Sequence, residues 1–141
     1  MSRIYWDSMI FIYLLEDHRQ FAPKVARIEE RMRFRHDTLH TSVFTLAENL
    51  VGPIRNREPE KAAKFRKIFH GHQINLISFT AETAEIYAEI RAGHSVSAPD
   101  AIHLASAAQA GIDLFLTNDL HLHRLHIPGI QFISGLDTRF F

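Results

Sequence analysis

The stretch Ile4-Tyr5-Trp6-Asp7-Ser8 decides the fold, because a short apolar run ends there in two polar residues. Asp and Ser are good N-cap residues, and the mostly apolar segment 9–15 follows them directly. The pattern predicts a strand that leads into a buried helix. The carboxylate of Asp7 is expected at the junction between the two.

The same alternation continues along the chain. Four further strands are expected, at 39–41, 74–79, 114–116 and 130–133. Further helices are expected at 21–34, at 43–51 with a stop at Gly52-Pro53, from Pro59 to near Gly71, from Thr80 to Gly93, and from Ser97 through Ala110. Short apolar strands separated by helices require crossover connections. We therefore predict an α/β fold in three α/β/α layers, with a mostly parallel sheet of about five strands.

Length and composition favour one domain over residues 1–141. The absence of cysteine excludes a disulfide scaffold, a cysteine nucleophile and an iron–sulfur cluster. The 16 Lys and Arg balance the 16 Asp and Glu, so bulk charge gives no argument for nucleic-acid binding. The apolar run 9–15 is too short to span a bilayer, and we expect a cytoplasmic protein without membrane contact.

Four acidic residues lie beside the predicted strands and helices: Asp7, Glu48, Asp100 and Asp119. Asp7 and Asp119 follow strands, whereas Glu48 and Asp100 lie in the opening turns of helices. In an open parallel sheet, the carboxyl ends of the strands and the starts of the following helices share one edge. We therefore expect the four carboxylates to project into a single cleft.

Each acid also has a structural interpretation, and the sequence leaves it open. Asp7 can cap the next helix, and Asp119 can serve a turn. Glu48 lies three residues after Thr45, the spacing of a capping box, and Asp100 lies three residues after Ser97.

A ring of carboxylates repels itself, and it persists most readily when a cation neutralises it. All-oxygen ligands without cysteine favour a hard ion, Mg²⁺ or Mn²⁺, over zinc. Such an ion lowers the pKa of a bound water and stabilises charge on an attacked phosphodiester. The predicted chemistry is metal-assisted phosphoryl transfer.

Four segments of the chain resemble the ordered motifs of the PIN-domain nucleases, and the best match is to the VapC-type toxin ribonucleases of toxin–antitoxin pairs. The segments are Ile4-Tyr5-Trp6-Asp7-Ser8, Thr41-Ser42-Val43-Phe44-Thr45-Leu46-Ala47-Glu48, Pro99-Asp100-Ala101-Ile102-His103-Leu104-Ala105 and Leu116-Thr117-Asn118-Asp119. The resemblance extends from Ile4 to about Ile133. It is the combination of segments that is specific.

The resemblance implies that Asp7, Glu48, Asp100 and Asp119 are catalytic and bind the metal, supported by Ser8, Thr117 and Asn118. It also implies a five-stranded parallel sheet, RNA cleavage dependent on Mg²⁺ or Mn²⁺, a homodimer, and inhibition by a small antitoxin. One position departs from the pattern. Many relatives have asparagine two residues after the first aspartate, where this chain has Met9.

Other interpretations remain open. The histidines at 70–72 and 121–126 allow a zinc site, and His103 is interpreted as a satisfied, partly buried histidine. Basic residues after the third helix can bind RNA phosphates or form an ordinary solvated face: Arg55, Arg57, Lys61 and Lys64, followed by Arg66 and Lys67. An acid-pocket phosphatase is disfavoured, because Met9 occupies the place of its second aspartate.

A PIN-like module that binds RNA or protein without catalysis is the alternative function. Five apolar residues are candidates for a dimer or antitoxin surface, with core packing as the default for each: Leu14, Leu15, Phe34, Phe44 and Phe69.

Overall fold

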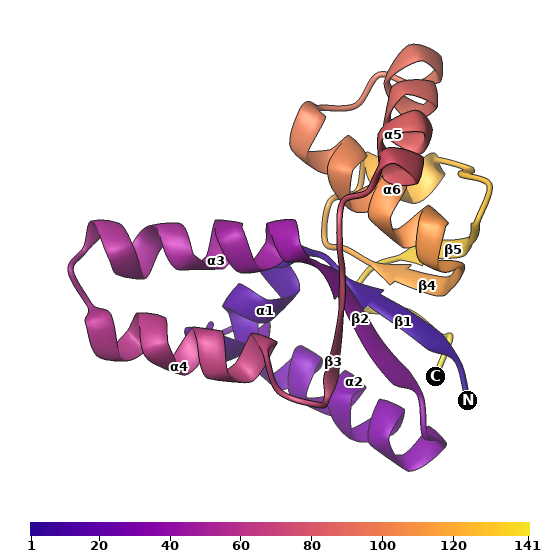
Figure 1. Cartoon of the computed structure of the whole chain (residues 1–141). Helices are drawn as coiled ribbons and strands as arrows, with labels where there is room; N and C mark the ends of the chain where they lie inside the picture. The colour runs from indigo at the N-terminus through magenta and orange to yellow at the C-terminus, as the bar shows by residue number, and fades with distance from the viewer.

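The computed structural model describes all 141 residues and contains five strands. They are β1 (Arg3–Trp6), β2 (Thr38–Ser42), β3 (Ile74–Ile77), β4 (Ile112–Leu116) and β5 (Ile130–Ser134). The strands form one sheet in the order β3-β2-β1-β4-β5, and every pair is parallel (Figure 1). The predicted five-stranded α/β fold is confirmed.

Six α-helices and one short 3-10 helix connect the strands. They are α1 (Ser8–Leu15), α2 (Ala22–Arg35), α3 (Val43–Arg55), α4 (Pro59–Phe69), α5 (Ala81–Gly93), α6 (Ala98–Ala110) and η1 (Leu122–Arg124). Figure 1 shows α5 and α6 together on one side of the sheet, while α3 and α4 form a hairpin that projects from it. None of these helices has the length and apolar character needed to cross a membrane.

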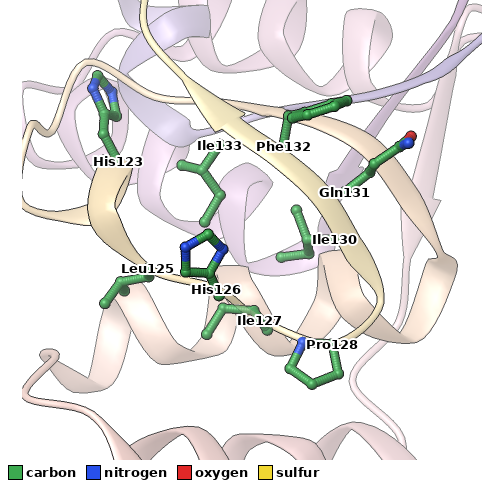
Figure 2. Close-up of a pocket in the computed structure, with 9 residues that line it drawn as sticks. All are labelled: His123, Leu125, His126, Ile127, Pro128, Ile130, Gln131, Phe132 and Ile133. Carbon is green, nitrogen blue, oxygen red and sulfur yellow. The ribbon is translucent and has the colours of Figure 1, made fainter.

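β5 lies at the edge of the sheet and pairs only with β4. A hollow of about 440 Å³ beside it is lined by residues that include His123, His126 and Phe132 (Figure 2).

The turn before β5 approaches α6 closely. Gly129 has φ of 98°, and a Cβ atom there would lie 2.5 Å from the backbone oxygen of Ala108.

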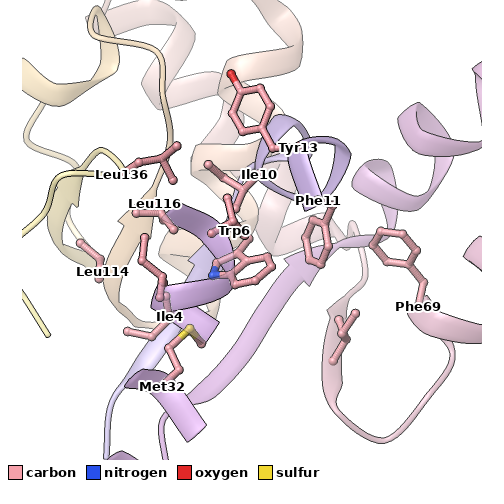
Figure 3. Packing of buried hydrophobic residues seen from close by; sticks show 13 residues of the cluster. Ile4, Trp6, Ile10, Phe11, Tyr13, Met32, Phe69, Leu114, Leu116 and Leu136 are labelled. Atoms are coloured by element: carbon pink, nitrogen blue, oxygen red, sulfur yellow. The ribbon is translucent and has the colours of Figure 1, made fainter. Parts of the chain in front are cut away.

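Both faces of the sheet are covered, and β1 shows how. Ile4 and Trp6 point to one face and join a cluster with residues of α1 and α2 (Figure 3). Tyr5 points to the other face and packs with α6. All three side chains are essentially inaccessible to solvent. Alternate residues of a strand face opposite sides, so a wholly apolar strand is the signature of a sheet covered on both.

The prediction that the third helix stops at Gly52-Pro53 is wrong, because α3 continues to Arg55. A proline normally disfavours helical conformation in the residue before it, by a clash with that residue's Cβ. Gly52 has no Cβ, so this clash is absent. β3 also ends at Ile77, two residues before the predicted end.

Replacing Gly129 with alanine should destabilise the protein by about 2 kcal/mol or more, because the left-handed backbone and the contact with Ala108 both oppose a Cβ. Gly93→Ala is the matched control. Gly93 ends α5 with nothing within 4 Å of a Cβ, so this change should be neutral or stabilise by up to about 1 kcal/mol. Urea unfolding of both variants measures the difference. Equal stabilities would contradict the close approach.

His40 on β2 should make the free energy of unfolding depend on pH. Burial, followed by the charge of Arg3, lowers the pKa of His40 to about 4, against 6.5 for the unfolded chain. Between these values the unfolded state binds a proton that the folded state does not. Stability should therefore fall by about 2 kcal/mol from pH 7 to pH 4.5 through this residue. Urea unfolding at both pH values should show a smaller loss in His40→Gln. An identical loss in both proteins would refute the assignment.

Candidate functional site

One pocket of about 450 Å³ contains all four predicted acids: Asp7, Glu48, Asp100 and Asp119. The predicted supporting residues Ser8, Thr117 and Asn118 also line it, and Met9, Ile12, Tyr13, Pro99 and His103 complete the lining. The structure thus brings the predicted site residues together. Their chemical roles remain predictions.

Asp7 connects two strands and a helix. Its backbone N–H donates to the carbonyl of Leu116 at the end of β4. Its carboxylate caps α1, where Oδ1 accepts from the backbone N–H of Ser8 at 2.8 Å, and Oδ2 accepts from Oγ1 of Thr117 at 2.7 Å. The predicted capping role is therefore real, and it places the carboxylate on the rim of the pocket.

Glu48 is held by side chains from two other helices. Its Oε1 accepts hydrogen bonds from Oγ of Ser8 on α1 and, at 2.7 Å, from Nε2 of His103 on α6. Burial acts to raise the pKa of Glu48, but these two hydrogen bonds outweigh it and hold the pKa below its ordinary value. No protein group donates to its Oε2, as the hydrogen bonds of Glu48 all involve Oε1.

The capping-box interpretation of Glu48 is wrong. Ser42 caps α3, and its Oγ accepts from the backbone N–H of Phe44 at 2.9 Å. Thr45, the expected cap, lies buried inside the first turn and pairs with Oγ1 of Thr41 at 2.7 Å. α3 begins at Val43, so Thr45 lies inside the helix and cannot form a capping box with Glu48. The side chain of Glu48 therefore faces the pocket.

Asp100 is the least compensated carboxylate. It lies in the first turn of α6, which Ser97 caps by accepting from the Asp100 backbone N–H at 3.3 Å. Burial, followed by the negative charges of Asp7 and Asp119, raises the pKa of Asp100. Asp119 accepts from the backbone N–H of His121 at 3.0 Å, which confirms its predicted place in a turn. Burial is the main cause of the raised pKa of Asp100, and like-charge repulsion from Asp7 and Asp119 adds to it.

The fit to a metal ion rests on this donor set. As the side chains lie, no three Asp, Glu or His residues converge closely enough to hold an ion. The chemistry nevertheless suits a hard divalent cation, because four carboxylates line one pocket without cysteine and Asp7 and Asp119 repel Asp100 there. A cation would relieve that repulsion.

Two contributors to the site were not assigned from the sequence. His103 is satisfied and buried, as expected, but it also bonds Glu48. Tyr5 was treated only as a strand residue, yet its hydroxyl lies 2.7 Å from Nδ1 of His103. The signal was present in the alternation of β1, which turns Tyr5 toward the helix that carries His103.

The remaining candidates lie apart from the pocket. Nε2 of His121 is hydrogen-bonded to the carbonyl of Ser95, and Nε2 of His123 is hydrogen-bonded to the carbonyl of Thr117. The two nitrogens therefore do not point at a common metal site. Lys61 pairs with Glu16 at 2.6 Å, while Arg55, Arg57 and Lys64 are exposed on the α3–α4 hairpin. Among the apolar candidates, Phe69 belongs to the core and Phe34 is 81% exposed.

Similar folds occur in several solved toxin–antitoxin structures. A chain of VapBC2 from Rickettsia felis, bound to a DNA fragment from its promoter, superimposes with a TM-score of 0.75 at 20% identity, covering 94% of this chain and 98% of that one. A chain of DNA-bound VapBC from Salmonella typhimurium superimposes with a TM-score of 0.72 at 22% identity, covering 96% of this chain and 99% of that one. VapC20 of Mycobacterium tuberculosis, a toxin that cleaves the sarcin–ricin loop, superimposes with a TM-score of 0.67 at 18% identity, covering 87% of this chain and 96% of that one.

At these identities the likeness establishes the fold alone. No curated protein sequence matches the chain. The PIN domain family model, in contrast, matches residues 4–127, which span all four acids and every strand except β5. The chain therefore belongs to the PIN domain family.

Proposed function

We propose that this protein is a metal-dependent endoribonuclease that acts as the toxin of a toxin–antitoxin pair. The observation that carries the proposal is the convergence of Asp7, Glu48, Asp100 and Asp119 on one pocket, at the sheet edge where ligands of open parallel sheets bind. The four residues come from separate segments of the chain. A set of mutually repelling acids gains little from a purely structural role, whereas a divalent cation would use it.

In this proposal Asp7, Glu48 and Asp100 hold a Mg²⁺ or Mn²⁺ ion, and Asp119 binds a second ion or orients water. The ion would supply Lewis-acid stabilisation of charge on the RNA phosphate and a more acidic water. The protein's own contribution is orientation. Ser8 and Thr117 fix the oxygens of Asp7, and the amide of Asn118 donates to the hydroxyl of Tyr13 at 3.3 Å on the pocket wall.

The proposed partners are a small antitoxin and a second copy of the chain in a homodimer, with RNA as substrate in the cytoplasm. The similar chains from R. felis and S. typhimurium come from VapBC complexes. Leu14 and Leu15 line a hollow of about 860 Å³, of mixed apolar and charged side chains, that an antitoxin segment can cover. The exposed ring of Phe34 is a further apolar contact for a partner.

Purified protein should cut a mixed cellular RNA pool at discrete sites with Mg²⁺ or Mn²⁺ and should be inactive in EDTA. Asp100→Asn should reduce the cleavage rate at least about 100-fold, because it removes a proposed ligand of the ion. Asp17→Asn is the matched control. Asp17 is exposed and outside the pocket, and its φ of 50° suits asparagine, so the rate should be unchanged.

Intact RNA with both ions, from folded protein that binds the metal, would rule out catalysis. That result would favour a PIN-like module that binds RNA or protein without cleaving it. Met9 is the observation that supports this alternative, because this 45% exposed residue lines the pocket where many relatives have asparagine.

The α3–α4 hairpin is the proposed RNA-binding surface, through Arg55, Arg57, Lys61 and Lys64. Arg57→Gln combined with Lys64→Gln should weaken RNA binding and lower the slope of log affinity against log salt by about 1 to 1.5. The measurement is fluorescence anisotropy with RNA in the Asp100→Asn background, which prevents cleavage. Arg27→Gln with Arg31→Gln, two exposed charges on α2, is the control. Equal slopes for the two double variants would assign the RNA surface elsewhere.

A further inference from the structure

A continuous line of polar groups runs from the core of the sheet to Glu48. Oη of Tyr5 and Nδ1 of His103 are 2.7 Å apart, as are Nε2 of His103 and Oε1 of Glu48. Tyr5 is fully buried and His103 is 2% exposed. The three residues belong to β1, α6 and α3, so the line joins elements that are distant in sequence.

The chemistry of the line gives it a direction. A phenol is protonated at neutral pH, so the buried hydroxyl of Tyr5 acts as a hydrogen-bond donor to the imidazole. Nδ1 of His103 is then the acceptor. An imidazole that accepts at Nδ1 carries its proton on Nε2, and Nε2 faces Glu48. Oγ of Ser8, 3.1 Å from Nε2, donates to the same oxygen of Glu48.

We propose that Tyr5 and His103 are positioning residues that hold Glu48 for a divalent cation. Tyr5 fixes the imidazole in the tautomer with the proton on Nε2, and the imidazole donates to Oε1 of Glu48. Oε2 is left without a protein donor and is available to the ion. This inference rests on the proposed function, since it concerns the same pocket.

Glu48 needs this support more than Asp7 does. Asp7 has a short side chain, held by a backbone N–H at the start of α1 and by Thr117. Glu48 has a longer side chain, one third exposed, and receives hydrogen bonds only from side chains. Without His103 its carboxylate would sample several rotamers, and a cation would have to order it on binding.

Core packing alone does not account for the hydroxyl of Tyr5. The ring stacks on Phe115, with centroids 4.8 Å apart and planes 7° apart. Phenylalanine would make the same stack without a buried polar atom. The hydroxyl therefore contributes through its hydrogen bond to His103, and Tyr5→Phe removes that bond while retaining the packing.

Nitrogen-15 NMR of the imidazole tests the first step without any metal or RNA. We expect the proton of His103 on Nε2, with Nδ1 bare and accepting a hydrogen bond. In Tyr5→Phe the Nδ1 resonance of His103 should move, because the donor at 2.7 Å is lost and only Oγ1 of Thr45, at 3.5 Å, is left beside Nδ1. A proton on Nδ1 in the wild type, or an unmoved resonance in Tyr5→Phe, would overturn the proposed relay.

Calorimetric titration with Mn²⁺ tests the second step. His103→Leu should weaken binding about 10- to 100-fold, the range found for groups that orient metal ligands. His103→Gln should restore binding to within about threefold, because its amide N–H can replace Nε2, and Tyr5→Phe should weaken it about three- to tenfold. Ser106→Ala, a buried polar deletion on α6 whose hydroxyl bonds only the carbonyl of Ile102, should bind normally.

Circular dichroism shows whether each variant is folded. If His103→Leu does not fold, the comparison of His103→Gln with Tyr5→Phe carries the test, and equal affinities of these two and the wild type would overturn the proposal. Failure of the two proposals is distinguishable. Wild type that binds Mn²⁺ but leaves RNA intact contradicts the nuclease and leaves the positioning role supported by the variants. RNA cleavage with unaltered Mn²⁺ affinity in His103→Leu contradicts the positioning role alone. Wild type that binds no Mn²⁺ contradicts both.

Discussion

The gathering of four carboxylates at one edge of the sheet, where Asp7 and Asp119 repel Asp100, is the constraint to which the rest of the pocket responds. Backbone and hydroxyl donors compensate Asp7, side chains from α1 and α6 compensate Glu48, and a turn amide compensates Asp119. Asp100 has the weakest compensation, and its pKa is raised. Carboxylates brought together in this way raise the electrostatic energy of the folded state, and the proposed cation would lower it.

Successive side chains of β1 alternate between the two faces of the sheet, and this alternation links the pocket to the core. Ile4 and Trp6 anchor the strand against α1 and α2, and the residue between them is therefore turned toward α6. That residue is Tyr5, whose hydroxyl reaches His103. One strand thus supplies apolar packing on one face, a hydrogen-bond donor on the other, and Asp7 at its end. The three buried residues Ile4 to Trp6 supply the first two, and Asp7 follows them directly.

Local signals account for most of what could be predicted from the sequence. Apolar runs located the five strands, and Asp7, Thr80 and Ser97 marked helix starts through side chains that bond nearby backbone. The expectation of a parallel sheet then predicted that the acids share one edge, because the carboxyl ends of parallel strands meet there whatever the strand order. The cap of α3 was missed since Ser42 and Thr45 compete for the same role. The pairing of His103 with Glu48, 55 residues apart, depends on how α3 approaches α6, and no local pattern encodes that approach.

Met9 affects which hydrogen-bond donors are present in the pocket, and it leaves the formal charge of the pocket unaltered. Met9 lines the pocket without adding or removing a formal charge, so Asp7 and Asp119 repel Asp100 as they would beside asparagine. What methionine does not supply is a strong hydrogen-bond donor at the start of α1. The hydroxyl of Ser8 already donates to Glu48 from that turn, and Asn118 presents an amide on the same wall through its bond to Tyr13. Polar contacts near the acids therefore come both from α1 and from the end of β4, and the absence of a donor at position 9 leaves the four carboxylates of the pocket in place.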